Sequence, residues 1–171
     1  LKVQGCFQMQ MEIKNVTILE DYNPKVEWYA DTSTYPTYLF DKFKIFRKDP
    51  GGAYQHVGDV FDQYKNYYVD TDIDGGEVDQ FSYKYKVEMV LNNIEMGKTR
   101  DINSILLKGG GNTCDTVNLI WKSYNGWQNP DYTVMLGTDD GAGGYTWTVH
   151  NHALSGANPT TDTVYKFVSN L

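Results

Sequence analysis

An acidic run near the middle of the chain has the residue types and spacing of a calcium loop. Asp70, Asp72 and Asp74 alternate and are followed by Gly75, as at the start of a D-x-D-x-D-G loop whose oxygens bind Ca²⁺. A complete loop also needs a bidentate carboxylate at its twelfth position, which is Phe81 here. We therefore favour an acidic loop between strands. Calcium at Asp70, Asp72 and Asp74 is the weaker alternative, and no other cofactor is expected.

Aromatic residues towards the C-terminus form the second group with the chemistry of a binding site. Trp127 lies in a turn-rich stretch, and Trp147 alternates with Tyr145 along an expected strand. Planar rings can stack on sugars or anchor a protein interface. Packing of these rings within the protein is the interpretation that we favour. If the rings are exposed, the ligand candidates are Trp127, Trp147 and Tyr124.

Histidine and serine residues give no complete catalytic pattern. His150 and His152 would share one face of a strand, as half of a metal site, but a third ligand is missing nearby. A polar strand face is the simpler interpretation. The G-x-S-x-G motif of serine hydrolases is absent, and no pair of carboxylates stands out by its spacing. We expect no catalytic residues and therefore no enzyme.

The composition indicates that these residues are carried by strands. The 171 residues include 14 Tyr and 16 Gly, which favour strands and turns over helices. The formal net charge of −7 repels phosphate backbones, so nucleic acid is not an expected partner. No stretch approaches the roughly 20 apolar residues of a membrane-spanning helix. The sequence predicts an all-β chain with no membrane span.

Alternation with a period of two predicts about seven short strands between residues 15 and 108. The clearest alternation runs from Tyr83 to Met89, and Asn92-Asn93 follows as a turn. Asp49-Pro50-Gly51-Gly52 has the composition of a turn and predicts a hairpin from Phe43 to Phe61. Short strands joined by such turns favour an antiparallel sandwich.

Glycines divide the chain into two parts. We expect a leading segment over residues 1–14, a complete module over 15–108, a Gly-rich linker over 109–114 and a second, truncated module over 115–171. Only about four strands fit into the last part, against the seven of a complete sandwich. A sheet without its last strand exposes unpaired backbone groups. Either the sequence stops before the closing strand, or a partner strand or a neighbouring module completes the sheet.

Residues 15–108 resemble the fibronectin type III family, in the form common to exported bacterial multidomain proteins. Members place a core Trp on the second strand, where Trp28 lies, and a Tyr at the start of the sixth strand, where Tyr83 lies as candidate corner tyrosine. The stretches 43–47 and 52–57 resemble the third and fourth strands. Trp121 repeats the Trp strand about one module length after Trp28, which indicates an internal repeat. The resemblance implies immunoglobulin-like β-sandwiches in which Trp28, Tyr83 and Trp121 are structural residues.

Taken together, these features predict a non-catalytic structural, adhesion or spacer module of a larger surface or secreted bacterial protein. The expected location is extracellular or at the cell surface, with a protein or a glycan as partner. The alternative is a carbohydrate-binding accessory module that uses exposed Trp and Tyr. Cys6 and Cys114 flank the first module at opposite poles, so we expect them to be free or to pair with another chain.

Overall fold

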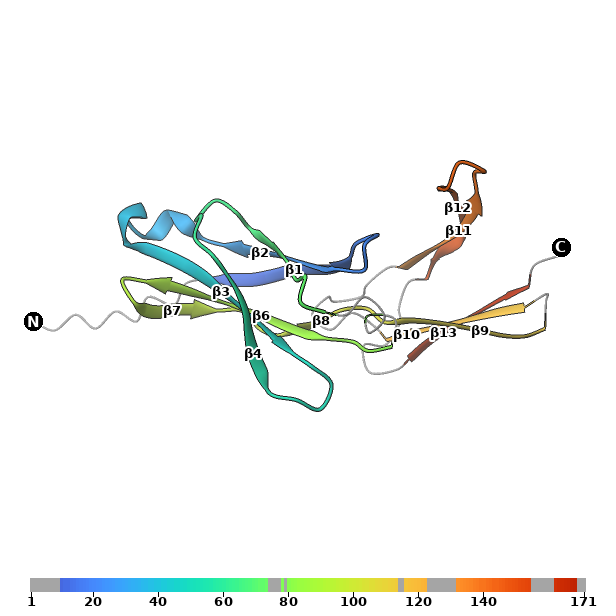
Figure 1. Ribbon diagram of the computed structural model, residues 1–171, viewed down its shortest axis with the longest axis horizontal. Helices are drawn as coiled ribbons and strands as arrows, with labels where there is room; N and C mark the ends of the chain where they lie inside the picture. The colour runs from blue at the N-terminus through green and yellow to red at the C-terminus, as the bar shows by residue number, and fades with distance from the viewer. Residues whose placement is uncertain are drawn as a thin grey trace, which may run out of the picture. The chain divides into compact units, whose positions relative to one another are not determined.

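The computed structural model describes residues 10–73, 78, 80–113, 116–122, 132–154 and 162–168. The chain divides into two compact units, Leu1–Lys108 and Gly109–Leu171. The described residues form mostly antiparallel strands and two 3₁₀ turns, without an α-helix (Figure 1). The prediction of an all-β chain is confirmed.

The first sheet of unit 1 has the strand order β1-β2-β5. Its strands are β1 (Met11–Ile18), β2 (Pro24–Ala30) and β5 (Tyr67–Val69). Buried Met11 and Ile13 alternate with exposed Glu12 and Lys14, so β1 begins inside the segment 1–14 that was predicted to precede the module. A register shift between Ile13 and Asn15 moves the alternation by one residue, so Val16 is the next buried residue of the strand.

The second sheet of unit 1 has the order β4-β3-β6-β7, and a short β8 also pairs with β6. Asp49 to Gly52 form the predicted turn between β3 and β4, with Gly51 at a φ of 73°. Asn92 and Asn93 turn β6 into β7 with φ values of 47° and 63°, a conformation that Asn tolerates. The strands are β3 (Phe40–Lys48), β4 (Tyr54–Val60), β6 (Lys84–Leu91), β7 (Ile94–Lys98) and β8 (Ile102–Asn103).

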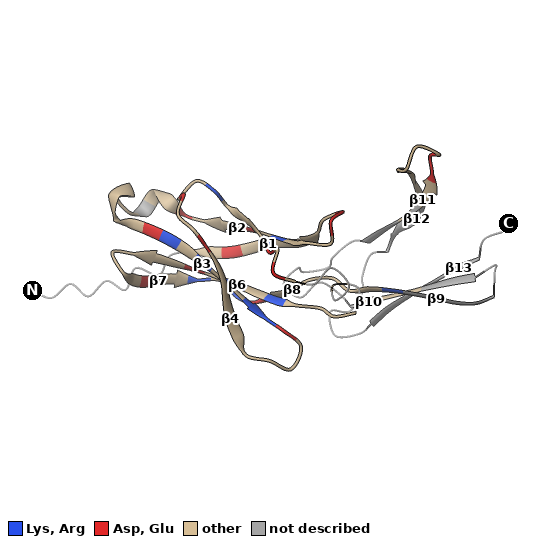
Figure 2. Cartoon of the chain, in the orientation of Figure 1, with Lys and Arg blue, Asp and Glu red and all other residues tan. Residues whose placement is uncertain are grey.

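Side chains from the two sheets meet in one core. The rings of Trp28 on β2 and Phe43 on β3 make an edge contact with 5.2 Å between centroids. Tyr85, Val87 and Met89 on β6 are fully buried. Basic and acidic residues are interspersed along the strands of unit 1 (Figure 2). Unit 1 is therefore sandwich-like, with an apolar interior between two antiparallel sheets.

Unit 2 contains a three-stranded sheet in the order β13-β10-β9 and a separate hairpin of β11 and β12. The predicted Gly-rich linker over 109–114 is wrong for most of its length, because residues 107–113 form β9 beside β10. Backbone pairing needs no side chain, so glycines can occupy a strand despite their poor intrinsic preference for it. Trp121 on β10 is buried and lies opposite Thr163 on β13. The strands are β9 (Leu107–Thr113), β10 (Thr116–Lys122), β11 (Tyr132–Asp139), β12 (Tyr145–Leu154) and β13 (Asp162–Val168).

Candidate functional site

Asp70, the first residue of the predicted calcium loop, is bound by side chains of its own module. The residue is fully buried directly after β5. Arg47 Nη1 and the Tyr85 hydroxyl each donate a hydrogen bond of 2.9 Å to Asp70 Oδ2. The other oxygen, Oδ1, accepts a hydrogen bond of 3.2 Å from the backbone N–H of Asp72. Both carboxylate oxygens are therefore engaged within the protein.

Arg47 is the cation that compensates this buried carboxylate. Its Nε donates to Asp49 Oδ1 at 2.8 Å, and its guanidinium carbon lies 5.8 Å from the centroid of the Tyr83 ring. Burial lowers the pKa of Arg47, but the hydrogen bonds that Arg47 donates to Asp70 and Asp49 outweigh burial and raise that pKa above its ordinary value. Burial, together with the charge of Asp70, raises the pKa of Tyr85. Arg47 thus stays charged, and Tyr85 keeps the proton that it donates.

This arrangement does not resemble a prepared calcium site. Asp72 is exposed, Asp74 lies outside the described residues, and a calcium ion at Asp70 would have to displace Arg47 and Tyr85. Within the described ranges, no group of three or more His, Cys, Asp or Glu side chains is placed to hold a metal ion. The hydrogen bonds of Asp70 hold β3 and β6 against the loop that follows β5.

The second predicted group, around Trp147, lies at the surface of the β11–β12 hairpin. Trp147 is 59 % exposed in the structure, and its packing against a neighbouring module stays a prediction. It lies opposite Gly137, and a Cβ on that glycine would stand 3.0 Å from Trp147 Cζ3. The Tyr145 ring is 6.0 Å away, centroid to centroid. We call the exposed large hydrophobic residues on this face of the hairpin the aromatic strip: Met135, Tyr145, Trp147 and Val149.

The structure describes only some of the remaining predicted site residues. Trp127, Tyr124, Cys6 and Cys114 lie outside the described residues. His150 and His152 belong to β12, but the described part does not include their side chains. Trp28, Tyr83 and Trp121 are all buried, in agreement with structural roles. The hydroxyl contact expected of Tyr83 as corner tyrosine stays a prediction.

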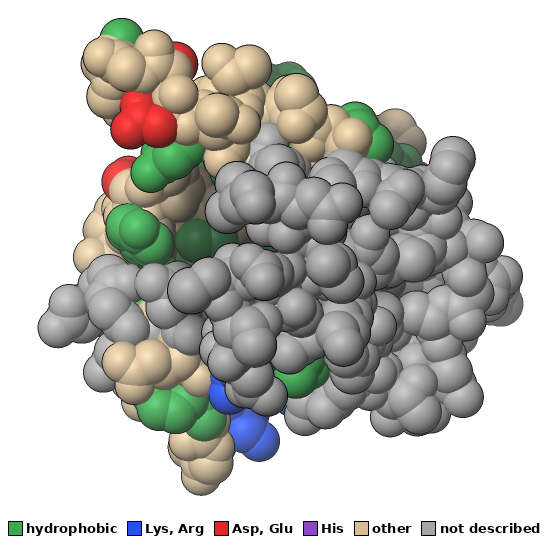
Figure 3. Space-filling model, turned by 90° about the vertical axis from the view of Figure 1, so that its right-hand side faces the viewer, with side chains coloured by type: hydrophobic (Ala, Val, Ile, Leu, Met, Phe, Trp, Pro, Cys, Tyr) green, Lys and Arg blue, Asp and Glu red, His purple; other side chains and the backbone are tan. Residues whose placement is uncertain are grey.

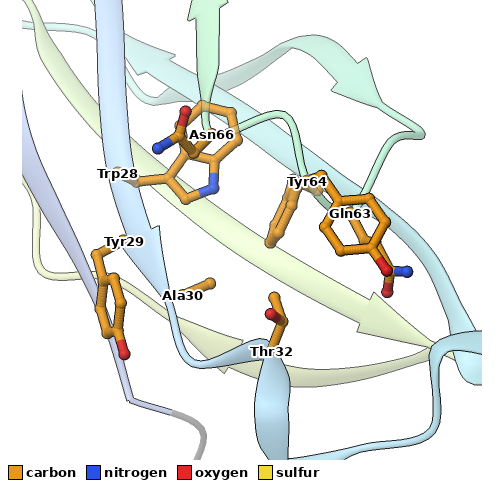
Figure 4. Close-up of a pocket in the computed structure, with 8 residues that line it drawn as sticks. Trp28, Tyr29, Ala30, Thr32, Gln63, Tyr64 and Asn66 are labelled. Atoms are coloured by element: carbon orange, nitrogen blue, oxygen red, sulfur yellow. The ribbon is translucent and has the colours of Figure 1, made fainter.

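A pocket beside Trp28 was missed from the sequence. It has a volume of about 170 Å³ and lies between the end of β2 and the loop that follows β4 (Figure 4). Trp28 was interpreted only as a core residue, because nothing in a sequence shows that one edge of a buried indole faces a hollow. Gln63 and Asn66, which line the other side, belong to a polar loop of unremarkable composition.

Comparisons with known proteins add no assignment. No protein-family model matches the sequence, and no curated protein matches it significantly.

Hydrophobic side chains lie beside acidic ones on the described part of the face in Figure 3. The described residues include no helix with the length and apolar character needed to cross a membrane.

Proposed function

We propose that this chain is a non-catalytic structural, adhesion or spacer segment of a larger surface or secreted bacterial protein. Unit 1 would be a fibronectin type III-like module with an immunoglobulin-like sandwich, and unit 2 a second, truncated copy. Its partner would be a protein or a glycan outside the cell.

The strand order of unit 1 is the observation that carries this proposal. The first, second and fifth strands share one sheet, whereas the third, sixth and seventh share the other, as in immunoglobulin-type sandwiches. Trp28 lies on the second strand, and Tyr83 directly precedes the sixth. The fourth strand pairs with the third, as the resemblance of residues 43–57 to the third and fourth strands of the family implies. Because a fold does not determine a function, this supports the architecture more directly than the role.

The buried Arg47–Asp70–Tyr85 network supports a mechanical role for unit 1. It joins β3, β6 and the loop after β5 through charge-assisted hydrogen bonds. The outer strands β13 and β9 of the unit 2 sheet support the expectation of a completing strand, since edge strands offer backbone groups for pairing.

Force spectroscopy on the full chain, held at its two ends, tests the spacer role. Unit 1 should unfold in one discrete step that lengthens the chain by about 300 Å, given roughly 3.3–3.6 Å per extended residue, and should refold when the force is released. Lengthening without a discrete step contradicts the spacer role. Turnover of glycoside or peptide substrates by the purified chain contradicts the non-catalytic assignment.

Carbohydrate binding at the aromatic strip is the second candidate function. Exposed planar rings offer faces on which a sugar can stack, and Trp147 and Tyr145 lie side by side on β12. A glycan array separates this function from the first. Binding that Trp147→Ala abolishes and Tyr38→Ala preserves supports it, because Tyr38 is an even more exposed aromatic residue and belongs to unit 1. Trp127 and Tyr124, the other two ligand candidates, are to be substituted in parallel.

A further inference from the structure

Two buried polar atoms beside the Trp28 pocket have no hydrogen-bond partner within the described structure: Trp28 Nε1 and Gln63 Oε1. Trp28 is fully buried, and its indole nitrogen lies on the side that faces the pocket (Figure 4). An unpaired buried polar group is costly, so such atoms normally find a partner in the protein, in water or in a ligand.

The chemistry of these two atoms restricts what can bind. The indole N–H only donates, whereas the Gln63 carbonyl oxygen only accepts. A bound molecule must therefore present an acceptor to Trp28 and a donor to Gln63, and hydroxyl groups supply both. Thr32 and Asn66 are further polar residues that line the pocket. The pocket thus favours a ligand with several hydroxyl groups.

The remaining wall favours a neutral, flat-faced ligand. Among the described residues that line the pocket, none carries a charge. Phe43 and Tyr64 contribute aromatic surface, and Tyr64 is 77 % exposed at the rim. Tyr29, on the opposite face of β2, points its ring away from the hollow (Figure 4). The C–H face of a sugar ring can lie against such an aromatic wall while its hydroxyls reach the polar atoms.

We propose that the Trp28 pocket binds a single neutral sugar ring through Trp28 Nε1, Gln63 Oε1 and the face of Tyr64. The volume of about 170 Å³ is far above the ~10–15 Å³ that admits one water, and it suits one ring rather than an extended chain. This site belongs to unit 1, whereas the aromatic strip belongs to unit 2, and it goes beyond the structural role proposed above.

The indole N–H of Trp28 provides a readout at the site itself. The chain has 4 Trp and so four indole signals in a ¹H–¹⁵N spectrum, which single Trp→Phe substitutions assign. The probes are methyl glucoside, methyl galactoside and methyl mannoside, added to the full chain up to about 50 mM, because a small ligand with few contacts binds in the millimolar range. We expect at least one probe to shift the Trp28 signal saturably.

Two variants test the contacts. Gln63→Leu should weaken binding about fivefold, as expected for the loss of one neutral hydrogen bond, and Tyr64→Ala should weaken it at least as much. Tyr38→Ala and Trp147→Ala are the controls and should leave the affinity unchanged. An unchanged dispersion of the amide spectrum shows that each variant is folded.

Three results would overturn the proposal. The first is the absence of a saturable Trp28 shift with all three probes, which means that the pocket holds water only. The second is binding that Gln63→Leu and Tyr64→Ala both leave intact. The third is a shift of the Trp147 signal without one at Trp28, which transfers sugar binding to the aromatic strip. None of these results bears on the mechanical test of the spacer role, so the two proposals fail independently.

Discussion

The ring of Tyr68 lies directly against Gly58, so close that a Cβ on Gly58 would stand 2.5 Å from Tyr68 Cζ. Tyr68 belongs to β5 in the first sheet and Gly58 to β4 at the edge of the second. The Tyr68 hydroxyl donates a 2.6 Å hydrogen bond to the carbonyl oxygen of Val57. One tyrosine thus joins the two sheets at a position where only glycine leaves room for its ring.

Gly58→Ala is therefore expected to lower the free energy of unfolding by about 2 kcal/mol, since overpacking forces the ring or the strand to move. Urea denaturation measures the loss. Gly52→Ala is the matched control and should change stability by less than about 0.5 kcal/mol, because a Cβ there meets only Asp49 atoms at 3.5 Å or more. Equal effects of the two substitutions would refute the steric explanation.

Removing the charge of Asp70 should be the most damaging single change in unit 1. Asp70→Asn leaves the buried Arg47 without its principal counter-charge, and breaking a buried ion pair in this way costs about 3–5 kcal/mol. Asp72→Asn is the control, because Asp72 is exposed and offers Arg47 only its backbone carbonyl. A loss below about 1 kcal/mol for Asp70→Asn in chemical denaturation would show that the pair contributes little.

Calcium should leave the stability of the chain unchanged. Ligands that bind only the folded state raise the melting temperature, but Ca²⁺ at Asp70 has to displace two hydrogen-bond donors. We expect melting curves in millimolar calcium and in chelator to coincide. A rise in melting temperature that Asp72→Asn removes would restore the calcium interpretation of this loop.

The Asp59 carboxylate gives unit 1 a component of stability that depends on pH. Burial alone would raise the pKa of Asp59, but hydrogen bonds from Lys42 and His56 outweigh burial and hold the pKa below its ordinary value of 3.8. A lowered pKa stabilises the folded state above the unfolded-state value, and the contribution disappears as pH falls through the folded-state value. Asp59→Asn should thus cost about 1 kcal/mol at pH 7 and less at pH 2, below the unfolded-state pKa.

Urea denaturation at both pH values checks the Asp59 prediction. Glu20→Gln, at an exposed position between β1 and β2, serves as control and should behave as the unsubstituted chain at either pH. A penalty for Asp59→Asn that is the same at pH 7 and pH 2 would rule out the ion pairs as its source.

Strands with strong local signals could be predicted from the sequence. The alternation from Tyr83 to Met89 corresponds to β6, and the turn at Asp49–Gly52 gives the β3–β4 hairpin. Both signals are local: side-chain alternation defines a buried face, and Pro and Gly define a turn. The strand β9 could not be predicted, because its glycines carry no alternation and its pairing with β10 is a matter of backbone hydrogen bonds.

The candidate sites depended on contacts that are distant in sequence. The spacing of Asp70 and Asp72 fits a calcium loop equally well whether or not Arg47, 23 residues earlier, reaches the carboxylate. The pocket depends on the orientation of the Trp28 indole relative to Gln63, which no local pattern records. The exposure of Trp147 depends on whether anything covers the hairpin, and alternation along one strand cannot decide that.

The Arg47–Asp70–Tyr85 network also limits which amino-acid substitutions this module can accept, whether by design or by evolution. Replacing any one member leaves a charge or a hydroxyl in the core without its partner, so each single substitution is expected to lower the stability of the protein. Exchanging all three for apolar side chains of similar volume removes the desolvation cost of the pair and is often neutral or stabilising. The three positions are therefore expected to change together, and a designer seeking a more stable scaffold would replace them as one set.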